Sequence, residues 1–305
     1  MTGSPPVLEA RGLAVAYADH VALAGFDVRL ERGRLTGLIG PDGAGKSTAI
    51  RALCGLVPHH EGEVSLDGVV PDRPRPALAR LVGYMPQRFS LYKDLTVREN
   101  IAFFARLHGV GRSRERERDL LVKMGMDRFT GRLAGRLSGG MKQKLALLCV
   151  LVHEPSLVIM DEPTTGVDPA SRREFWRILG ELTAQGMAIL VATPYLDEAE
   201  RCHEVLLMHE GRTMLRGDPD DLVAALERPV FAVPTADPFV LKRRLASADW
   251  VRTAQAFGDR LHLTCEDGNE DEESVSRRLA LEGLAETARE VSPTLEDVFI
   301  ERVDA

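Results

Sequence analysis

The sequence has few cysteines, few aromatic residues and no excess of positive charge. Its 305 residues include only four cysteines, and none has the CxxC spacing of a zinc or redox motif, so we expect buried, reduced thiols at Cys54, Cys149, Cys202 and Cys265. Lys and Arg number 39 against 46 Asp and Glu, which gives a net charge of −7. Such a chain lacks the basic surface that non-specific binding of nucleic acid requires, so no nucleic-acid partner is predicted.

Long apolar segments are also missing. No apolar run approaches the roughly 18 residues needed to cross a bilayer, and the longest candidate, at 145–152, is much shorter. The first residues, MTGSPPVLEARG, contain no basic segment followed by an apolar one, so no signal peptide is expected. The adjacent His59 and His60 have no ligand-type neighbours at metal spacing and are interpreted as loop surface. We therefore expect a cytoplasmic chain that does not itself span a membrane.

Short, continuous apolar runs are typical of strands buried on both faces of a parallel sheet. Such runs occupy residues 35–39, 81–85, 157–160, 188–192 and 205–208. Between them apolar residues recur with helical period, as at Phe175, Ile178, Leu179 and Leu182. The alternation of strands and helices predicts an α/β, doubly wound core.

Helix starts and a change of character suggest the domain organisation. Thr96 with Glu99 predicts a capping box, and Asp168 before Pro169 predicts an N-cap followed by proline at the first helical position. Residues from about 94 to 139 have no strand signal and are interpreted as a helical lobe, in which the charged run 112–118 forms a solvated helix face.

The character of the chain changes at Arg228. We therefore expect a first domain over 1–228 and a small α+β domain over 229–305. The predicted strands of the second domain are 230–233, 250–256 and 261–264, and its predicted helices lie around 239–245 and 275–281. The acidic sequence GNEDEE is expected to form a loop after the last strand.

One segment has the pattern of a phosphate-binding loop. Residues 40–47, GPDGAGKS, fit G-x-x-x-x-G-K-[ST] and join a predicted strand to a predicted helix. Glycines let backbone N–H groups turn toward an anion, and the helix N-terminus adds partial positive charge. Lys46 is predicted to reach the β- and γ-phosphates and Ser47 to ligate Mg²⁺. The predicted nucleotide-binding residues of the loop are Gly40, Pro41, Asp42, Gly43, Ala44, Gly45, Lys46, Ser47 and Thr48.

A second motif places two carboxylates at the end of an apolar strand. The run LVIM at 157–160 is followed by Asp161 and Glu162. Ligands of open α/β sheets bind at the carboxyl ends of the strands. Asp161 is therefore predicted to hold Mg²⁺, directly or through water, and Glu162 to orient and deprotonate an attacking water.

A third motif, LSGG at 137–140, lies between these two. The phosphate loop, LSGG and the LVIMDE strand, in this order, resemble the ABC transporter ATPase family over about residues 7–226. The resemblance implies a P-loop core with an antiparallel β subdomain and a helical lobe, and hydrolysis of ATP with Mg²⁺. It also implies two subunits packed head to tail, with ATP between the phosphate loop of one and Ser138, Gly139 and Gly140 of the other.

The resemblance implies roles for further residues. Tyr17 matches the aromatic residue that stacks on adenine, with a core tyrosine as the alternative. Gln87 matches the glutamine that touches Mg²⁺ and the attacking water, and the loop at 166–168 matches the one that meets its counterpart across the dimer. The helical lobe matches the part that contacts a membrane permease. Residues 292–299, SPTLEDVF, resemble the C-terminal tail of ATPases that serve bacterial drug, polysaccharide or antibiotic exporters, which favours export.

Two residues depart from the family pattern. Asp42 replaces an asparagine, and its charge near phosphate is expected to weaken nucleotide binding somewhat. Pro194 stands where the family has a histidine that bonds the γ-phosphate, and proline has no N–H to donate. We expect Thr193 to cap a helix that starts at Pro194. The hypothesis is a slowly hydrolysing site, which favours an asymmetric heterodimer; the alternative is a homodimer in which Glu162 suffices.

The favoured interpretation is an ABC exporter ATPase, peripheral on the cytoplasmic face of the cell membrane, which works with a separate permease and a second ATPase subunit. Two rivals remain open. The first is a nucleotide-gated regulatory subunit that is essentially non-hydrolysing, which Pro194 favours and Glu162 opposes. The second is a soluble ABC ATPase that acts on ribosomes or DNA, which the acidic net charge disfavours.

Overall fold

The computed structural model describes residues 5–18, 20–58, 61–70, 74–88, 91–111, 114–284 and 286–303. The chain divides into two compact units, residues 1–216 and 217–305, and each is described by itself. The assignment of functional domains to 1–228 and 229–305 stays a prediction. The predictions for His59, His60 and the beginning of the charged run 112–118 lie outside the described residues.

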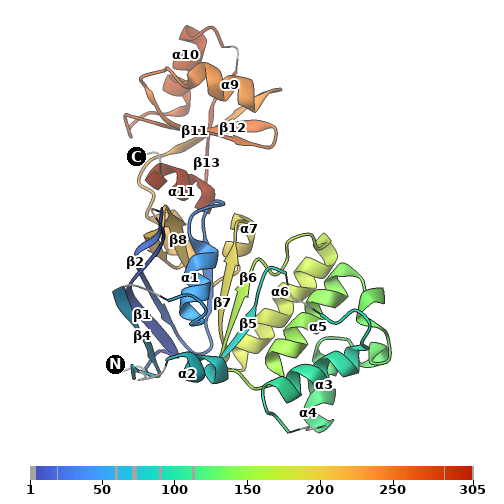
Figure 1. Cartoon of the computed structure of the whole chain (residues 1–305). Coiled ribbons are helices and arrows are strands. Elements are labelled where there is room, and N and C mark those ends of the chain that lie inside the picture. Colours follow the sequence, from blue (N-terminus) through green and yellow to red (C-terminus); the bar gives the residue numbers. More distant parts are fainter. Residues whose placement is uncertain are drawn as a thin grey trace. The chain divides into compact units, whose positions relative to one another are not determined.

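A six-stranded sheet forms the centre of the first unit (Figure 1). The pairs β5–β6, β6–β7, β7–β3 and β3–β8 are parallel. The predicted apolar runs lie in this sheet, except that Leu81, the first residue of the run 81–85, ends helix α2. Strands such as β3 and β6 are buried along their whole length. The predicted α/β core is thus confirmed. In spatial order the strands are β5 (Val82–Met85), β6 (Leu157–Asp161), β7 (Ala188–Thr193), β3 (Leu35–Ile39), β8 (Glu204–His209) and β9 (Arg212–Gly217).

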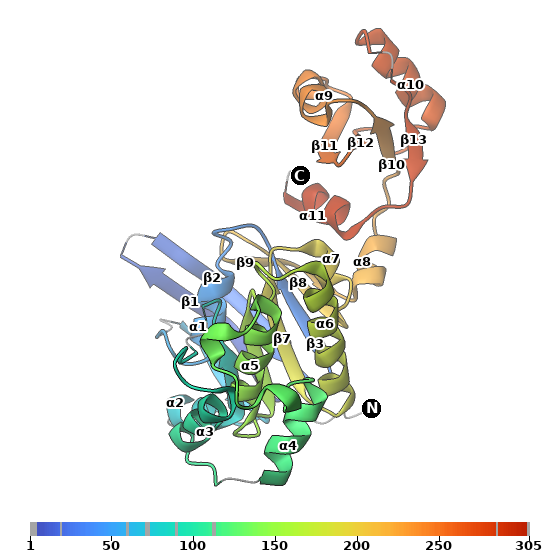
Figure 2. The same cartoon turned by 90° about the vertical axis from the view of Figure 1, so that its right-hand side faces the viewer.

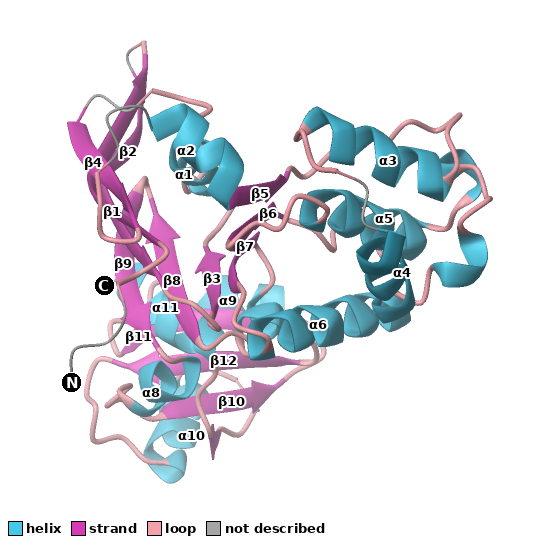
Figure 3. Ribbon diagram, turned by 90° about the horizontal axis from the view of Figure 1, so that it is seen from below, coloured by secondary structure: helices cyan, strands magenta, loops and turns pink. Residues whose placement is uncertain are grey.

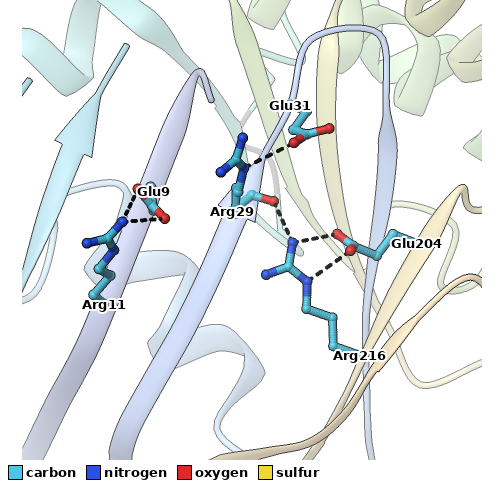
Figure 4. Close-up of polar contacts among 6 residues, drawn as sticks. All are labelled: Glu9, Arg11, Arg29, Glu31, Glu204 and Arg216. Atoms are coloured by element: carbon cyan, nitrogen blue, oxygen red, sulfur yellow. Dashed lines mark hydrogen bonds and ion pairs between the residues drawn. The ribbon is translucent and has the colours of Figure 1, made fainter. Parts of the chain in front are cut away.

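A three-stranded antiparallel sheet accompanies the parallel one, in agreement with the antiparallel subdomain that the resemblance implied. Its central strand β1 (Leu8–Tyr17) pairs with β2 (His20–Leu30) and with β4 (Glu61–Leu66). Arg216 on β9 links the two sheets: its guanidinium makes two bonds to Glu204 on β8, of 2.9 and 3.1 Å, and reaches the Arg29 carbonyl on β2 at 3.4 Å (Figure 4).

The helices of the first unit cover the six-stranded sheet. Helix α1 contacts both β1 and β2 as well as β6 and β7, so it lies between the two sheets. Helices α3 and α4 lie beside the sheet within the predicted helical lobe of residues 94–139, and α5 begins where that range ends (Figure 3). The predicted capping box is confirmed, because Glu99 N–H donates to the Thr96 hydroxyl at 3.2 Å while the Glu99 carboxylate accepts from Thr96 N–H at 2.8 Å. The helices are α1 (Lys46–Leu53), α2 (Pro74–Leu81), α3 (Val97–Leu107), α4 (Arg114–Lys123), α5 (Gly139–Leu151), α6 (Pro169–Ala184) and α7 (Leu196–Ala199).

The second unit is a small α+β fold (Figure 2). Its antiparallel sheet has the order β11-β12-β10-β13, and an apolar cluster that includes Phe231, Leu241 and Val275 lies between this sheet and two helices. The strands are β10 (Val230–Pro234), β11 (Val251–Phe257), β12 (Arg260–Cys265) and β13 (Arg289–Val291). The helices are α8 (Pro219–Ala224), α9 (Pro238–Leu245), α10 (Glu272–Leu281) and α11 (Leu295–Val303).

Two expectations for the second unit are wrong. The acidic sequence is not a loop throughout, because Asp271 caps α10 and Glu272 and Glu273 form its first turn. Carboxylates are stabilised there by the N–H groups that the helix start leaves unpaired. The strand before it is not the last strand either, since β13 follows and pairs with β10.

The four cysteines are free; Cys149, Cys202 and Cys265 are buried, whereas Cys54 is only partly buried. Burial raises the pKa of the Cys202 thiol to about 12, as is typical of an unreactive thiol. Within the described residues, the model contains no helix that is both long enough and apolar enough to cross a bilayer.

Candidate active site

The predicted phosphate loop lies between β3 and α1, and close backbone approach requires its glycines. A Cβ atom at Gly40 would lie 2.2 Å from the carbonyl oxygen of Met208. At Gly45, which has φ +100°, a Cβ would lie 2.6 Å from the carbonyl oxygen of Ala22. By contrast, a Cβ at Gly43 would have no atom within 4 Å. Only glycine fits at the two ends of the loop, so the glycines of the motif allow the backbone to adopt this conformation.

Lys46 is buried within the loop, with 5% of its surface exposed. Its Nζ donates to the carbonyl oxygens of Gly40 and Pro41, at 2.7 and 2.9 Å. Burial lowers the pKa of this ammonium, and the carboxylates of Glu162, Asp42 and Asp161 oppose that shift. The carboxylate of Asp42, the residue that departs from the family pattern, therefore influences the pKa of Lys46 itself. An anionic ligand at the loop would favour the charged lysine in the same way that these carboxylates do.

Asp161 and Ser47 together offer oxygen ligands for a divalent cation. Asp161 ends β6 and is 3% exposed. Burial raises the pKa of its carboxyl group, while a hydrogen bond from Ser47 opposes the shift. The Oδ1 atom has no hydrogen-bond partner among the described residues. Buried polar atoms are normally satisfied, and hydroxyl and carboxylate oxygens are ligands that Mg²⁺ prefers, so this donor set fits a magnesium ion.

The fold brings Gln87 to Glu162, residues that lie 75 positions apart in the sequence. The Gln87 Nε2 atom donates to Glu162 Oε2 at 2.8 Å, and the Thr165 hydroxyl donates to the same oxygen at 3.1 Å. Glu162 has φ +47°, a left-handed conformation that is unfavourable for a residue with a side chain. Such strain is typical of functional sites, where the surrounding contacts fix the backbone.

The LSGG segment begins helix α5. The Ser138 hydroxyl accepts from Met141 N–H at 3.3 Å, so Ser138 is the N-cap, and both Ser138 and Gly139 are exposed. Gly140 is required by packing, because a Cβ there would lie 2.4 Å from the Ser171 side chain on α6. In the described structure the Ser138 side chain is thus hydrogen-bonded to its own helix and not to the phosphate loop.

Two further sequence predictions concern single residues. Tyr17 ends β1 with 45% of its surface exposed, so the alternative of a core tyrosine is wrong. Pro194 follows β7 but does not begin a helix, because α7 starts at Leu196. The expected cap is also wrong, because the N-cap of α7 is Tyr195. The Thr193 hydroxyl accepts from Tyr195 N–H at 3.1 Å before the helix begins, and it donates to the Glu198 carboxylate at 2.7 Å.

Sequence reasoning missed two residues that contact the site or its neighbouring loops. Thr165 orients Glu162, and Glu198 binds the segment before Pro194. For Thr165 the only signal is a hydroxyl residue three positions after the carboxylate. Glu198 gives no local signal for its contact with Thr164, which lies 34 positions away in the sequence.

Comparison with known proteins gives consistent results. The family model described as ABC transporter matches residues 23–165. The Nod factor export ATP-binding protein I of Burkholderia thailandensis is 35% identical over 289 residues, which cover 93% of this chain and 92% of that protein. The probable multidrug ABC transporter ATP-binding protein YbhF of Escherichia coli is 49% identical over 210 residues, 68% of this chain; the match covers only 36% of its own length, so the chain spans about a third of that relative.

The fold is also found among solved structures. A structure of the ATP binding subunit of an ABC transporter superposes with a TM-score of 0.64 at 32% identity. The match covers 72% of this chain and 92% of that one.

Proposed function

Because the chain belongs to the ABC transporter ATP-binding family, we propose that it binds Mg-ATP and hydrolyses it to drive a membrane permease. The observation that carries the proposal is that the glycine loop encloses Lys46 while Gln87 donates to Glu162 at 2.8 Å beside Asp161 at the end of β6. Phosphate binding, metal binding and water activation thus belong to a single site.

Each residue of this site has one part in the proposed reaction. The loop amides and Lys46 bind the phosphates, and Ser47, Asp161 and Gln87 hold Mg²⁺, which neutralises charge on the phosphoryl oxygens. Glu162 accepts a proton from the attacking water. The bonds from Gln87 and Thr165 to its Oε2 support this role, because they fix the direction of the carboxylate and leave Oε1 for the water.

A second ATPase subunit completes the proposed site. The exposed start of α5 at Ser138 and Gly139 presents unpaired N–H groups, which favour an anion. We infer that it contacts ATP bound to a partner subunit, which is either a second copy or a related chain. Tyr17, with its exposed ring, is proposed to stack on adenine.

We further propose that the complex works in export and that this chain lies at the cytoplasmic face of the membrane, where its helical lobe contacts the permease. The names of two relatives, a multidrug transporter protein and a Nod factor export protein, support this direction. The tail at 292–299 gives independent support from the sequence.

Turnover of the purified full chain tests the proposal. Lys46→Ala is expected to weaken Mg-ATP binding at least tenfold, whereas Glu162→Gln should keep binding and lose about 10²- to 10⁴-fold in turnover, the usual contribution of a general base. Lys123→Ala is the matched control, since that lysine bonds Gln185 outside the loop. Unchanged turnover in Glu162→Gln would overturn the assignment.

Pro194 defines a second experiment. If the missing donor slows this site, Pro194→His should raise turnover by about 10²- to 10³-fold, the effect of one well-placed transition-state donor. A fast parent chain that histidine does not improve would contradict the slow-site hypothesis. Binding without turnover in both chains would instead favour a nucleotide-gated regulatory subunit.

A further inference from the structure

We propose that Glu198 is a positioning residue for hydrolysis: with Thr164 and Thr193 it forms a buried clamp that holds the loop of Glu162 against the segment of Pro194. We name these three residues the Glu198 clamp. The inference rests on the proposed function, and it adds a residue that no motif of the sequence analysis contains.

The clamp connects the segments that follow β6 and β7, beyond the last backbone hydrogen bond between these strands. Strands β6 and β7 are neighbours, and the last bond of their ladder runs from Glu162 N–H to the Ala192 carbonyl at 2.9 Å. After this bond the segment that follows β6 leads to α6, and the segment that follows β7 leads to α7. Glu198 Oε1 accepts the Thr164 hydroxyl at 2.6 Å, and Oε2 accepts the Thr193 hydroxyl at 2.7 Å. One carboxylate therefore joins the two loops where backbone pairing has ended.

The clamp is fully enclosed. Glu198, Thr164 and Thr193 are 0%, 1% and 1% exposed. Each carboxylate oxygen accepts one threonine hydroxyl, and the Arg172 Nε atom lies 3.5 Å from Oε1, within ion-pair distance. The same guanidinium lies 4.7 Å from the ring centre of Tyr195, so it also braces the segment after Pro194.

An ion pair with a buried carboxylate contributes little net stability, since desolvation cancels most of the attraction. The specific geometry of the clamp comes instead from the two threonine hydroxyls that donate to Glu198. An apolar cluster would hold α7 in place without this geometry. The charged clamp is therefore better explained by the need to fix two loops relative to each other than by stability alone.

The residue that needs such fixing is Glu162. Its left-handed backbone, with φ +47°, persists only where the surroundings hold it. Ala192 holds its N–H, and Thr164, two residues later, is held by Glu198. With the backbone fixed on both sides, the carboxylate points to Gln87 and Thr165. Without the clamp the Glu162 carboxylate would no longer be held in this direction, although every group that binds nucleotide would remain.

Removing single hydroxyl groups in the full chain tests the clamp. Thr164→Val and Thr193→Val keep side-chain shape, and each is expected to lower kcat by about 10- to 100-fold, the usual effect of a small displacement of a catalytic group. The Kd for Mg-ATP should stay within about twofold, because no phosphate or metal ligand is lost. Thr164→Ser and Thr193→Ser restore the hydroxyl and should recover most of the turnover.

Thr183→Val is the matched control, because Thr183 is also buried and its hydroxyl bonds the Leu179 carbonyl on α6 at 3.1 Å, outside the clamp. This variant should lose about as much thermal stability as the two clamp valine variants, but its turnover should not change. If the clamp valines reduce kcat no more than Thr183→Val does, the inference is wrong while the proposed ATPase function stands.

A double variant separates positioning from general damage. Groups that act as one unit have non-additive effects, so adding Glu198→Gln to Glu162→Gln should leave the residual turnover unchanged. A further fall of tenfold or more would overturn the assignment to Glu162. A parent chain that neither binds nor hydrolyses Mg-ATP would instead refute the proposed function itself.

Discussion

Buried carboxylates occur in both units of the chain, but their surroundings differ. In the second unit Asp297 accepts from the Thr294 hydroxyl at 2.7 Å and lies 3.1 Å from His262 Nδ1. Nearby, Glu301 accepts from Arg252 at 2.5 Å and from the Thr264 hydroxyl at 3.2 Å. These groups satisfy one another and fasten α11 to strands β11 and β12.

In the first unit Asp161 is equally buried, yet its Oδ1 has no hydrogen-bond partner among the described residues. The pKa values reflect the contrast. Burial raises the pKa of Asp161. Burial also acts to raise that of Asp297, but hydrogen bonds from His262 and Thr294 outweigh it, so the pKa of Asp297 is lowered. Asp297 is thus satisfied within the fold, whereas Asp161 Oδ1, which has no partner among the described residues, supports the proposal that Asp161 binds a ligand.

The largest expected effect comes from Asp161→Asn. Turnover should fall by at least about 100-fold, because even residues behind a metal ligand contribute 10- to 100-fold. Stability at pH 7 should be unchanged or higher, since the folded-state pKa is raised and the ionised carboxyl is therefore unfavourable in the fold. Urea unfolding and an ATPase assay on the same preparation check both points. A marked loss of stability would contradict the comparison.

Asp297→Asn should show the opposite pattern. We expect the free energy of unfolding of the second unit to fall by about 1.5–3 kcal/mol, the usual value of hydrogen bonds to a charged group, with Mg-ATP affinity unchanged. Because the folded-state pKa lies below 3.8, the stabilisation is present above that pH and is lost as the pH falls through the folded-state pKa. The asparagine variant should lack this acid-dependent loss, which unfolding monitored between pH 7 and pH 3 would reveal.

The smallest effect concerns His153, a half-buried residue of the first unit that stacks on His108 at 3.9 Å and has no part in the predicted site. Burial lowers its pKa from 6.5 to about 4. The unfolded chain therefore binds a proton that the folded chain does not, and stability should fall as the pH falls from 6.5 to 4.

His153→Phe should reduce that acid loss by about 1 kcal/mol, a value discounted for the partial exposure of the ring. Urea midpoints at pH 7.5 and pH 5 measure the difference. His20→Phe, at an exposed strand position, is the control and should leave the pH dependence as it is in the parent. An equal pH dependence in all three chains would refute the prediction.

Five strands of the six-stranded sheet were predictable because each contains a short apolar run, whereas β9 alternates between exposed and half-buried positions and was not predicted. Leu35–Ile39, for example, is buried at every position and has no competing interpretation. The antiparallel strands β1, β2 and β4 of the first unit gave no such signal. β1 contains Glu9, Arg11 and Gly12, and its pairing with β2 shifts register three times, so the period of two is broken. β13 has only three residues and depends on its partner β10.

The site divides in the same way. The conformation of the loop at 40–47 depends on residues that are close in the sequence, so its glycines and Lys46 could be identified from spacing alone. The start of α7 was wrongly placed because local rules favour a helix at Pro194. The Thr193 hydroxyl, however, is engaged by Glu198, and the helix begins only at Leu196.

The sequence by itself determined the phosphate loop, the buried strands and the carboxylates at the end of β6, since backbone conformation and burial follow from neighbouring residues. Only the tertiary structure decided which side chains meet. The contact of Gln87 with Glu162 and the clamp of Glu198 on Thr164 depend on the strand order β5-β6-β7, which no local pattern specifies. The reason is physical: hydrophobic periodicity fixes which face of an element is buried, but not which element covers it.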